Sequence, residues 1–369
     1  MLVEPTWPRV LETLVNGENL SIQQSAWSMG QIVAGEATPA QIAAFLMGLR
    51  IKGETIDEIV GFRDAVLAAA TPLGVPSAVL DIVGTGGDPY GAVLNISSVA
   101  AIVAAASGVP VVKHGNRAAS SSSGASDFLA ALGVRTDLSA DGVAAVFREV
   151  GITFAFAGLL HPGFRHVSGV RQEMGVSTLF NVLGPLCNPA RPEASAVGVA
   201  NADRAPLIAG VFQTRGATAL VFRGDDGIDK LTTTGHSHVW EVSQGSIREH
   251  DLDPREFGIP RVTIDTILGK GPDYNASAAR MVLNGENGAV RDIVLLNAAA
   301  GIVAAGLSKQ PDHFNRSITS RFQSALGNAS EAVDSGAARD KLEAWIAATH
   351  RTPNSRSVAS MRARPGGLG

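Results

Sequence analysis

The first residues whose types and spacing could bind a ligand form a glycine-rich turn, Gly84-Thr85-Gly86-Gly87-Asp88. Three glycines in four positions let backbone N–H groups approach an anion closely, because no side chain projects into the space. The turn is not the dinucleotide fingerprint, whose third glycine would fall on Pro89, and it lacks the Gly-Lys-Ser/Thr of a Walker loop. A glycine-rich turn alone is more often structural than functional. Whether this turn binds a ligand therefore has to be judged from the polar clusters that follow it in the sequence.

Two polar clusters follow this turn along the chain. Asn95-Ile96-Ser97-Ser98 opens an Ala/Val-rich helix, where a hydroxyl can cap the helix or bind an anion or a metal. A second cluster directly follows an apolar run and contains cations, an imidazole, an amide and hydroxyls: Lys113, His114, Asn116, Arg117, Ser120, Ser121, Ser122 and Ser123. Cations with many hydrogen-bonding groups suit a phosphorylated, hydroxylated ligand. For the serine run, the alternative is a flexible linker.

Two further clusters carry charge that a substrate or a metal could use. Arg171 could pair with a substrate carboxylate through its planar guanidinium. Asp225, Asp226 and Asp229 form an acidic turn, which near a phosphate site suggests Mg²⁺; the alternative is a turn held by its glycines. His161 and His166 are five residues apart with a proline between them, so we do not expect them to bind one metal ion together.

The elements that must position these clusters divide the chain into two units. Residues 1–75 show only helical signals, including the capping boxes Ser21–Gln24 and Thr55–Glu58. After Pro76, short apolar runs alternate with helical stretches, which predicts an α/β fold with a mainly parallel central sheet. The α/β unit covers 76–173 and 192–349, and residues 350–369 are predicted to be a disordered tail because Ser, Pro, Gly and Arg alternate without an apolar face.

Composition excludes several classes of function. The 369 residues carry a net charge of −4, which argues against nucleic-acid binding, and one cysteine, Cys187, excludes a disulfide framework. No apolar run is long enough to span a bilayer and no secretory signal is present, so we expect a cytoplasmic protein without membrane contacts.

Taken together, the clusters resemble the anthranilate phosphoribosyltransferase family. The motifs GTGGD, NISS, KHGNRAASS, HPxxRH, VRxExG…FNxLGPLxNP and GDDGxD occur in family order from about Leu11 to Ala348. The resemblance implies a small helical domain joined by residues 174–191, a larger α/β domain of the nucleoside phosphorylase/phosphoribosyltransferase type, and a homodimer. It also implies transfer of phosphoribosyl from 5-phosphoribosyl 1-diphosphate to the amine of anthranilate, with release of diphosphate, in tryptophan biosynthesis.

The resemblance assigns roles to individual residues. Those expected to bind the donor are Gly84, Gly86, Gly87, Asp88, Asn95, Ser97, Ser98, Lys113, Ser120, Ser121, Ser122 and Ser123. Those expected on the acceptor side are His114, Asn116, Arg171 and Pro185. Ser97 and Asp229 would be Mg²⁺ ligands. The amine is already nucleophilic, so catalysis would consist of positioning and charge stabilisation, and no residue is singled out as catalytic.

Two departures from the family pattern leave alternatives open. Lys230 stands where the family has a glutamate that serves the metal ions, which puts two-metal binding in question. The segment PYGAVL between Asp88 and Asn95 is one residue longer than is usual in the family. Both departures favour a second interpretation, a specialised paralogue with another aromatic acceptor. A pyrimidine nucleoside phosphorylase fits the KHGNR and FNxLGP runs less well, and a nucleic-acid-binding relative would need a basic face.

Overall fold

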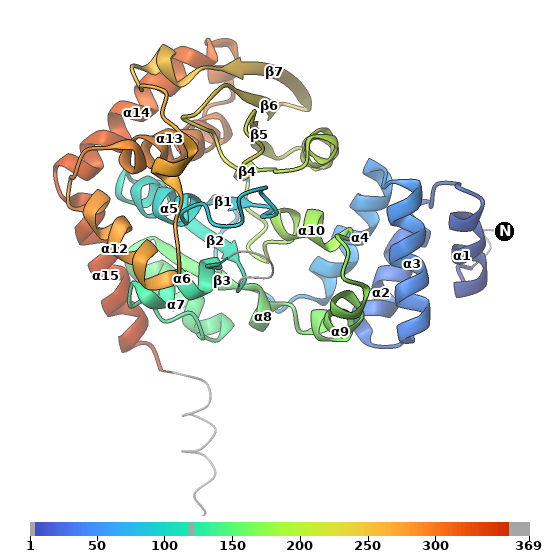
Figure 1. Ribbon diagram of the computed structural model, residues 1–369. Coiled ribbons are helices and arrows are strands. Elements are labelled where there is room, and N and C mark those ends of the chain that lie inside the picture. The colour runs from blue at the N-terminus through green and yellow to red at the C-terminus, as the bar shows by residue number, and fades with distance from the viewer. Residues whose placement is uncertain (1–3, 118–121, 354–369) are drawn as a thin grey trace, which may run out of the picture.

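A computed structural model describes residues 4–117 and 122–353, and it places a group of helices beside a larger α/β unit (Figure 1). The N-terminal helices are α1 (Trp7–Val15), α2 (Ile22–Ala34), α3 (Pro39–Lys52) and α4 (Ile56–Ala69). Both predicted capping boxes are present, and Thr38 forms a third with Gln41. Each box satisfies backbone donors that a helix start would leave without a partner, so these short motifs determine where the helices begin.

The larger unit is built on a seven-stranded sheet in the order β3-β2-β1-β4-β5-β6-β7. Its strands are β1 (Leu80–Gly84), β2 (Val111–Gly115), β3 (Ile152–Phe156), β4 (Ala194–Gly198), β5 (Thr218–Gly224), β6 (Ser237–Ser243) and β7 (Ser246–Leu252). Strands β1 to β5 are parallel, whereas β6 and β7 are antiparallel additions. The mainly parallel sheet predicted from the alternation of strands and helices is therefore confirmed.

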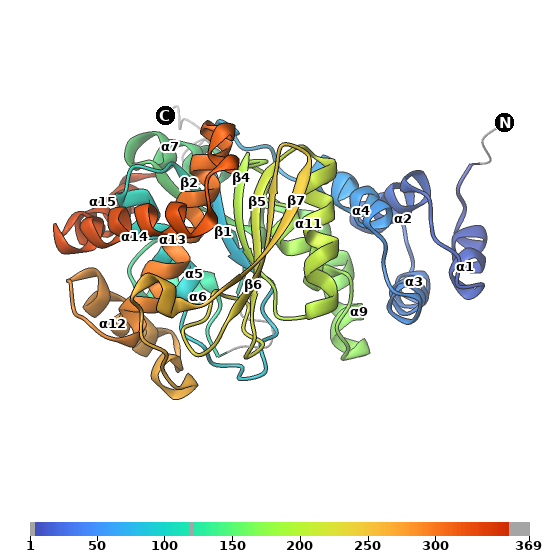
Figure 2. The ribbon, with the colours of Figure 1, turned by 90° about the horizontal axis from the view of Figure 1, so that it is seen from above.

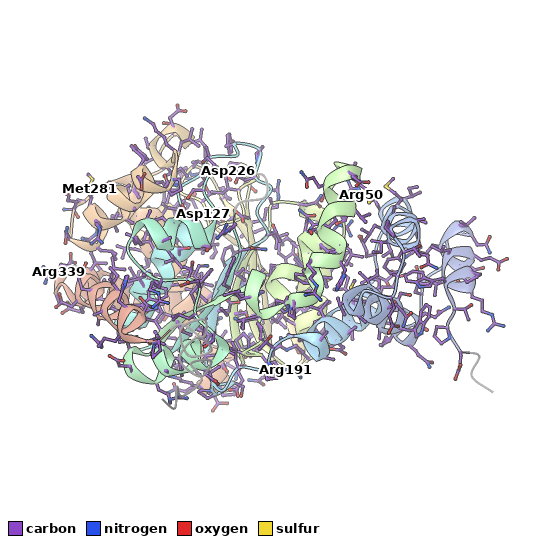
Figure 3. The ribbon with its side chains drawn as sticks, turned by 90° about the horizontal axis from the view of Figure 1, so that it is seen from below. Arg50, Asp127, Arg191, Asp226, Met281 and Arg339 are labelled. Atoms are coloured by element: carbon purple, nitrogen blue, oxygen red, sulfur yellow. The ribbon has the colours of Figure 1, made fainter. Side chains whose placement is uncertain are left out.

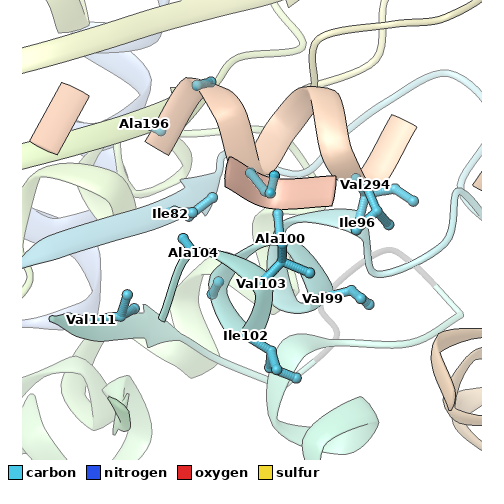
Figure 4. Packing of buried hydrophobic residues seen from close by; sticks show 14 of the residues in the cluster. Ile82, Ile96, Val99, Ala100, Ile102, Val103, Ala104, Val111, Ala196 and Val294 are labelled. Carbon is cyan, nitrogen blue, oxygen red and sulfur yellow. The ribbon is translucent and has the colours of Figure 1, made fainter. Parts of the chain in front are cut away.

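One face of the sheet is covered by most of the helices of the α/β unit (Figure 2). They are α5 (Ile96–Ala106), α6 (Ala125–Ala131), α7 (Ala140–Val150), α12 (Pro272–Leu283), α13 (Ala289–Lys309), α14 (Ile318–Asp334) and α15 (Ala337–Arg351). The core between them joins Ile82 and Val111 of the strands to Val103 of α5 and Val294 of α13 (Figure 4). Small alanines along α5 let it pack closely against the sheet.

Helix α13 is the one described helix long and apolar enough to cross a membrane, and 78% of its apolar window is buried within the fold. Helix α15 continues through His350 to Arg351, into the range predicted as a tail. Residues 354–369, which hold the rest of that range, lie outside the described residues.

The opposite face of the sheet packs against α11 (Ala205–Thr214), and α4 in turn packs against α11, so that the N-terminal helices share a second core with the sheet. This core also takes residues from α9 (Arg165–Met174) and α10 (Phe180–Leu183), and α9 contacts both α2 and α3. At Gly210 of α11 an added Cβ would lie 2.3 Å from Ile56 Cδ1, so a larger residue here would have to push the Ile56 side chain of α4 aside. Glu54 and Arg204 form an ion pair across the same junction.

Candidate active site

The predicted clusters meet at the carboxyl ends of β1, β2, β4 and β5, which lie at one edge of the sheet. Open α/β sheets bind their ligands at this edge. Asp226, which follows β5, lies here, whereas Arg191, which precedes β4, lies at the opposite edge (Figure 3). Asp226 accepts hydrogen bonds from the hydroxyls of Thr232 and Thr234, both at 2.7 Å, so this carboxylate is occupied in holding its own turn.

The glycine-rich turn after β1 is built around the side chain of Asp229. The Gly86 N–H donates to Asp229 Oδ2 at 2.8 Å. A Cβ at Gly84 would lie 2.1 Å from the same oxygen, and a Cβ at Gly198 would lie 1.7 Å from the Asp229 carbonyl oxygen. Only glycine at these two strand ends lets the acidic turn come so close. The turn then leaves Gly86 and Gly87 exposed, with positive φ angles of 67° and 80°.

Asp88 closes the turn through its own backbone neighbours. Its Oδ1 accepts the N–H groups of Tyr90 at 3.0 Å and Gly91 at 2.9 Å. This local arrangement holds the loop that leads to α5 and is typical of an aspartate in a turn.

Asp229 and Lys230 form a buried ion pair, with 5% and 8% of each residue exposed. Asp229 therefore offers a carboxylate that already accepts from an ammonium and from a backbone N–H. Among the described residues no group of three His, Cys, Asp or Glu side chains could hold a metal ion. The oxygen donors of Asp229 and Ser97 are of the type that Mg²⁺ prefers, and they suit an ion whose other ligands are substrate oxygens and water. They do not suit an ion held by protein alone.

Lys113 of β2 is 1% exposed and shares its surroundings with the buried carboxylate of Asp81 on β1. Its Nζ donates to the Ile82 carbonyl at 2.7 Å. Burial lowers the pKa of Lys113 from 10.5 to about 8, against the attraction of Asp81. Burial raises the pKa of Asp81 from 3.8 to about 6, against the attraction of Lys113. A buried cation with one backbone partner is suited to receiving an anion.

Asp81 also connects the neighbouring strand to the segment after α10. Its Oδ1 accepts the His114 N–H at 3.0 Å, and its Oδ2 accepts from Asn188 Nδ2 at 2.9 Å. The same Asn188 amide donates to the Val112 carbonyl at 2.8 Å. Neither Asp81 nor Asn188 was singled out from the sequence. A lone carboxylate within the apolar run from Val79 to Val83 is the signal that could have found it, because an unpaired buried charge is costly.

The acceptor-side residues are connected by a series of rings that runs from β2 to α9. His114 lies edge-to-face with His161 at 5.3 Å between centroids, and His161 stacks on Phe164 at 4.9 Å. Phe164 then contacts Phe180 at 5.5 Å, and the Arg171 guanidinium lies 5.3 Å from the centre of the Phe180 ring. The three rings between His114 and Arg171 were not predicted to belong to the site.

Burial keeps both histidines of this series uncharged. It lowers the pKa of His114 from 6.5 to about 3 and the pKa of His161 to about 4. His114 Nδ1 lies 3.0 Å from the Gly184 carbonyl, which can only accept, so a neutral ring carries its proton on Nδ1. Its Nε2 is then an acceptor, and it has no hydrogen-bond partner among the described residues.

Arg171 is fixed at one end of its guanidinium. Its Nη2 donates to Asn181 Oδ1 at 3.2 Å, while its Nε is buried and has no partner in the described part of the chain. Pro185 is buried in the turn η2 (Gly184–Leu186) that receives His114. Asn116 is exposed just beyond β2, and its Oδ1 accepts the Arg117 N–H at 2.8 Å.

The hydroxyl cluster lies at the start of α5 and beside it. Ser97 is in the first turn of α5, and Ser98 is 1% exposed with an Oγ that has no hydrogen-bond partner among the described groups. A buried hydroxyl of this kind is costly unless a ligand supplies the bond. Asn95, which precedes α5, donates from Nδ2 to the Ser123 carbonyl at 3.0 Å. Ser120 and Ser121 lie outside the described residues.

Both parts of the chain, the N-terminal helices and the α/β unit, match models of known protein families. Residues 76–339 match the family model described as "Glycosyl transferase family, a/b domain", and residues 8–70 match "Glycosyl transferase family, helical bundle domain". The boundary between the two matches falls at the junction of α4 and β1. The fold class predicted from the sequence, a small helical domain with a larger α/β domain, is thereby confirmed.

Curated relatives and solved structures point to one activity. A relative from Clavibacter michiganensis subsp. michiganensis, named anthranilate phosphoribosyltransferase, is 63% identical over 94% of this chain and 98% of its own length. The enzyme of that name from Thermus thermophilus has a TM-score of 0.84 and 39% identity, covering 92% of this chain and 99% of its own. The Saccharomyces cerevisiae enzyme, solved in complex with PRPP and Mg, has a TM-score of 0.83 and 27% identity, over 94% and 98% of the two chains.

Proposed function

Because the chain belongs to the anthranilate phosphoribosyltransferase family, we propose that it transfers the phosphoribosyl group of 5-phosphoribosyl 1-diphosphate (PRPP) to the amine of anthranilate and releases diphosphate. The observation that carries the proposal is the 63% identity to an enzyme of that name over almost the full length of both chains. The strand-end site, with its open glycine turn and buried Lys113, supports it. The product would enter tryptophan biosynthesis.

The donor would bind along the turn after β1, the start of α5 and the segment after β2. The backbone N–H of exposed Gly87 can approach phosphate oxygens, and the Lys113 ammonium can neutralise their charge. The Ser98 hydroxyl, which has no hydrogen-bond partner among residues 4–117 and 122–353, supplies a further group at this end of α5. These residues would hold the donor while the glycosidic bond loosens, so the protein stabilises the charge that develops on diphosphate.

A Mg²⁺ ion bound with the donor would share Asp229 and Ser97 as its protein ligands and would neutralise diphosphate charge. The S. cerevisiae enzyme is described in complex with PRPP and Mg. The ion pair between Asp229 and Lys230 limits how many Mg²⁺ ions this protein can hold, because an ammonium repels a nearby divalent cation. We therefore propose one protein-bound Mg²⁺, with the Lys230 ammonium as a fixed positive charge beside it.

Anthranilate would bind between His114 and Arg171, along the series of rings. The Arg171 guanidinium would pair with the carboxylate, which supplies the partner that its Nε lacks within the described part of the chain. The Nε2 of neutral His114 would accept a hydrogen bond from the aromatic amine and orient its lone pair. The S. cerevisiae enzyme has also been solved in complex with 4-fluoroanthranilate, a fluorinated form of the proposed acceptor.

A homodimer formed through the helical domain is a further part of the proposal. Val15 and Ile51 are 84% and 81% exposed, and both lie on the N-terminal helices or at their ends. Both side chains would be buried if a second copy packed against these helices. Sedimentation velocity of the wild type and of Ile51→Asp tests it, since the proposal requires the variant to shift toward monomer. We also propose a cytoplasmic location, which cell fractionation tests.

The experiment that tests the activity measures diphosphate release from PRPP with anthranilate and with a panel of other aromatic amines and acids. The proposal expects the highest kcat/KM with anthranilate. Higher kcat/KM with another aromatic acid would favour the specialised paralogue, which the Lys230 substitution favours among the alternatives. Release of free base from a pyrimidine nucleoside by phosphate would instead indicate a phosphorylase.

A further inference from the structure

A segment far along the chain, residues 267–275, which leads into α12 and includes its first turn, runs beside the loop that precedes α5. Val93 and Leu268 form an isolated antiparallel bridge. The Leu94 N–H donates to the Ile267 carbonyl at 3.2 Å, and the Gly269 N–H donates to the Ala92 carbonyl at 2.5 Å. The loop from Asp88 to Asn95 is thus paired along its second half with the 267–275 segment.

Asn275, the last residue of this segment, is 1% exposed and uses both ends of its amide. Its Oδ1 accepts the Lys270 N–H at 2.8 Å, which closes the segment on itself. Its Nδ2 donates to Asn95 Oδ1 at 2.9 Å, and Asn95 in turn donates to the Ser123 carbonyl at 3.0 Å. Two amides in series therefore join α12 to the start of α5 and to the serine-rich segment.

The serine-rich segment, meaning here Ser122 and Ser123, has a second attachment to the same place. Ser122 donates from Oγ to the Lys270 carbonyl at 2.9 Å and from its N–H to the Gly91 carbonyl at 3.2 Å. Two loops that approach the proposed donor site from different strands are thus held by one segment, and Asn275 is the buried side chain that joins all three.

We propose that Asn275 is a positioning residue for the donor site, acting through Asn95 and the serine-rich segment without touching the ligand itself. This rests on the proposed function, because the donor role of Asn95 and of the serines belongs to it. The amide of Asn275 dictates the orientation of the Asn95 amide, because its N–H must meet the Asn95 oxygen. That leaves the Asn95 nitrogen for the Ser123 carbonyl. Without Asn275 the donor would have to order both loops when it binds, which weakens binding.

Asn275→Asp tests this with a side chain of the same shape. The introduced carboxylate can still accept from the Lys270 N–H but cannot donate to Asn95. If the Asn95 amide flips to donate to that carboxylate, its oxygen then opposes the Ser123 carbonyl, so one link is broken in either orientation. Asn275→Ala removes the link without adding charge. Asn284→Asp, at the exposed end of the same helix, adds the charge alone and is the matched control.

We expect both Asn275 variants to raise the KM for PRPP by about tenfold, the effect of one lost hydrogen bond, while the KM for anthranilate changes by less than about twofold. Asn284→Asp should match the wild type. Hydrogen exchange without substrate should become faster in peptides covering 88–95 and 122–125 of both Asn275 variants. A donor KM that stays at the wild-type value in Asn275→Asp overturns the proposal, as does an equal rise in both KM values.

The exchange measurement separates this inference from the proposed function. If the wild type releases no diphosphate from PRPP, the function is wrong, and the exchange rates alone then decide whether Asn275 holds the two loops. Unchanged exchange in a folded Asn275→Asp protein contradicts the positioning role whatever the activity is.

Discussion

Replacing Asp81 with asparagine should separate the stability of the protein from its use of the donor. The side chain keeps its shape, and its oxygen can still accept the His114 N–H. Its new NH₂ group opposes the NH₂ group of Asn188, which the Val112 carbonyl and the Ala190 N–H hold in one orientation. The substitution also removes the carboxylate that favours the charged form of Lys113.

The effect on stability combines two opposing contributions. Burial raises the pKa of Asp81 from 3.8 to about 6, so between these values the native state binds more protons than the unfolded chain. This group therefore makes the free energy of unfolding fall as the pH rises from 3.8 to 6, by about 3 kcal/mol at ~1.36 kcal/mol per unit. An asparagine does not ionise, so Asp81→Asn removes this fall in the free energy of unfolding. The two NH₂ groups that then face each other, that of the new side chain and that of Asn188, lower the same free energy by about 1–3 kcal/mol. Near pH 7 the free energy of unfolding should stay within about 2 kcal/mol of the wild type.

The effect on the donor should be larger and should depend on pH. The pKa of Lys113 is about 8 in the wild type, so its ammonium is lost as the pH rises through 8. Without the Asp81 charge that pKa moves lower, and the ammonium is lost nearer neutral pH. The KM for PRPP should therefore begin to rise at a lower pH in the variant than in the wild type.

Steady-state kinetics at several pH values between about 6 and 9, with denaturant unfolding at each, measure both effects. Asp312→Asn, an exposed aspartate far along the chain, is the matched control and should follow the wild type. A folded Asp81→Asn protein whose donor KM has the wild-type pH profile would refute the link between Asp81 and Lys113. A loss of stability of about 5 kcal/mol near pH 7 would refute the balance of opposing contributions.

Four other substitutions test the site. Arg171→Ala should raise the KM for anthranilate far more than the KM for PRPP, and equal losses in steady-state kinetics would indicate a structural role. Lys113→Ala should weaken PRPP binding measured by calorimetry and leave the fold intact by circular dichroism. Lys230→Glu should steepen the dependence of activity on Mg²⁺, and an unchanged Mg²⁺ titration would contradict our account of the ion pair. Gly84→Ala should cost about 1–3 kcal/mol and weaken Mg²⁺ dependence, since its Cβ must displace the Asp229 carboxylate, as unfolding and metal titrations would show.

The sequence was informative where local chemistry determines structure. An apolar run that ends in glycine predicted β1, and the capping boxes predicted the starts of α2 and α4, because these signals act within a few residues. Strand β7 was missed because its side chains are mostly exposed and polar on an edge strand, which leaves little apolar alternation. Helix α12 was missed because Gly271 and Pro272 at its start resemble a loop.

For the candidate site, the order of motifs in the sequence predicted which loops form it. It did not predict which buried side chains hold those loops in place. Asp81, Asn188 and Asn275 act through partners that are far away along the chain or adjacent only through the sheet, as the 180-residue separation of Asn275 from Asn95 shows. No local pattern encodes such pairs. The series of rings from His114 to Arg171 likewise exists only once β2, α9 and α10 are assembled.

The second core has a consequence for how the chain folds during synthesis. It contains Trp7 of α1 and Val242 of β6, so it cannot be completed until residues far from the N-terminus have left the ribosome. At about 5–20 residues per second, the interval between the end of α4 and the arrival of β6 lasts roughly 10–35 s. Until α11 has emerged, the apolar residues of α4 that pack against it have no partner. Slower translation or higher temperature should therefore increase aggregation of nascent chains, and an assisting chaperone would act on the N-terminal helices first.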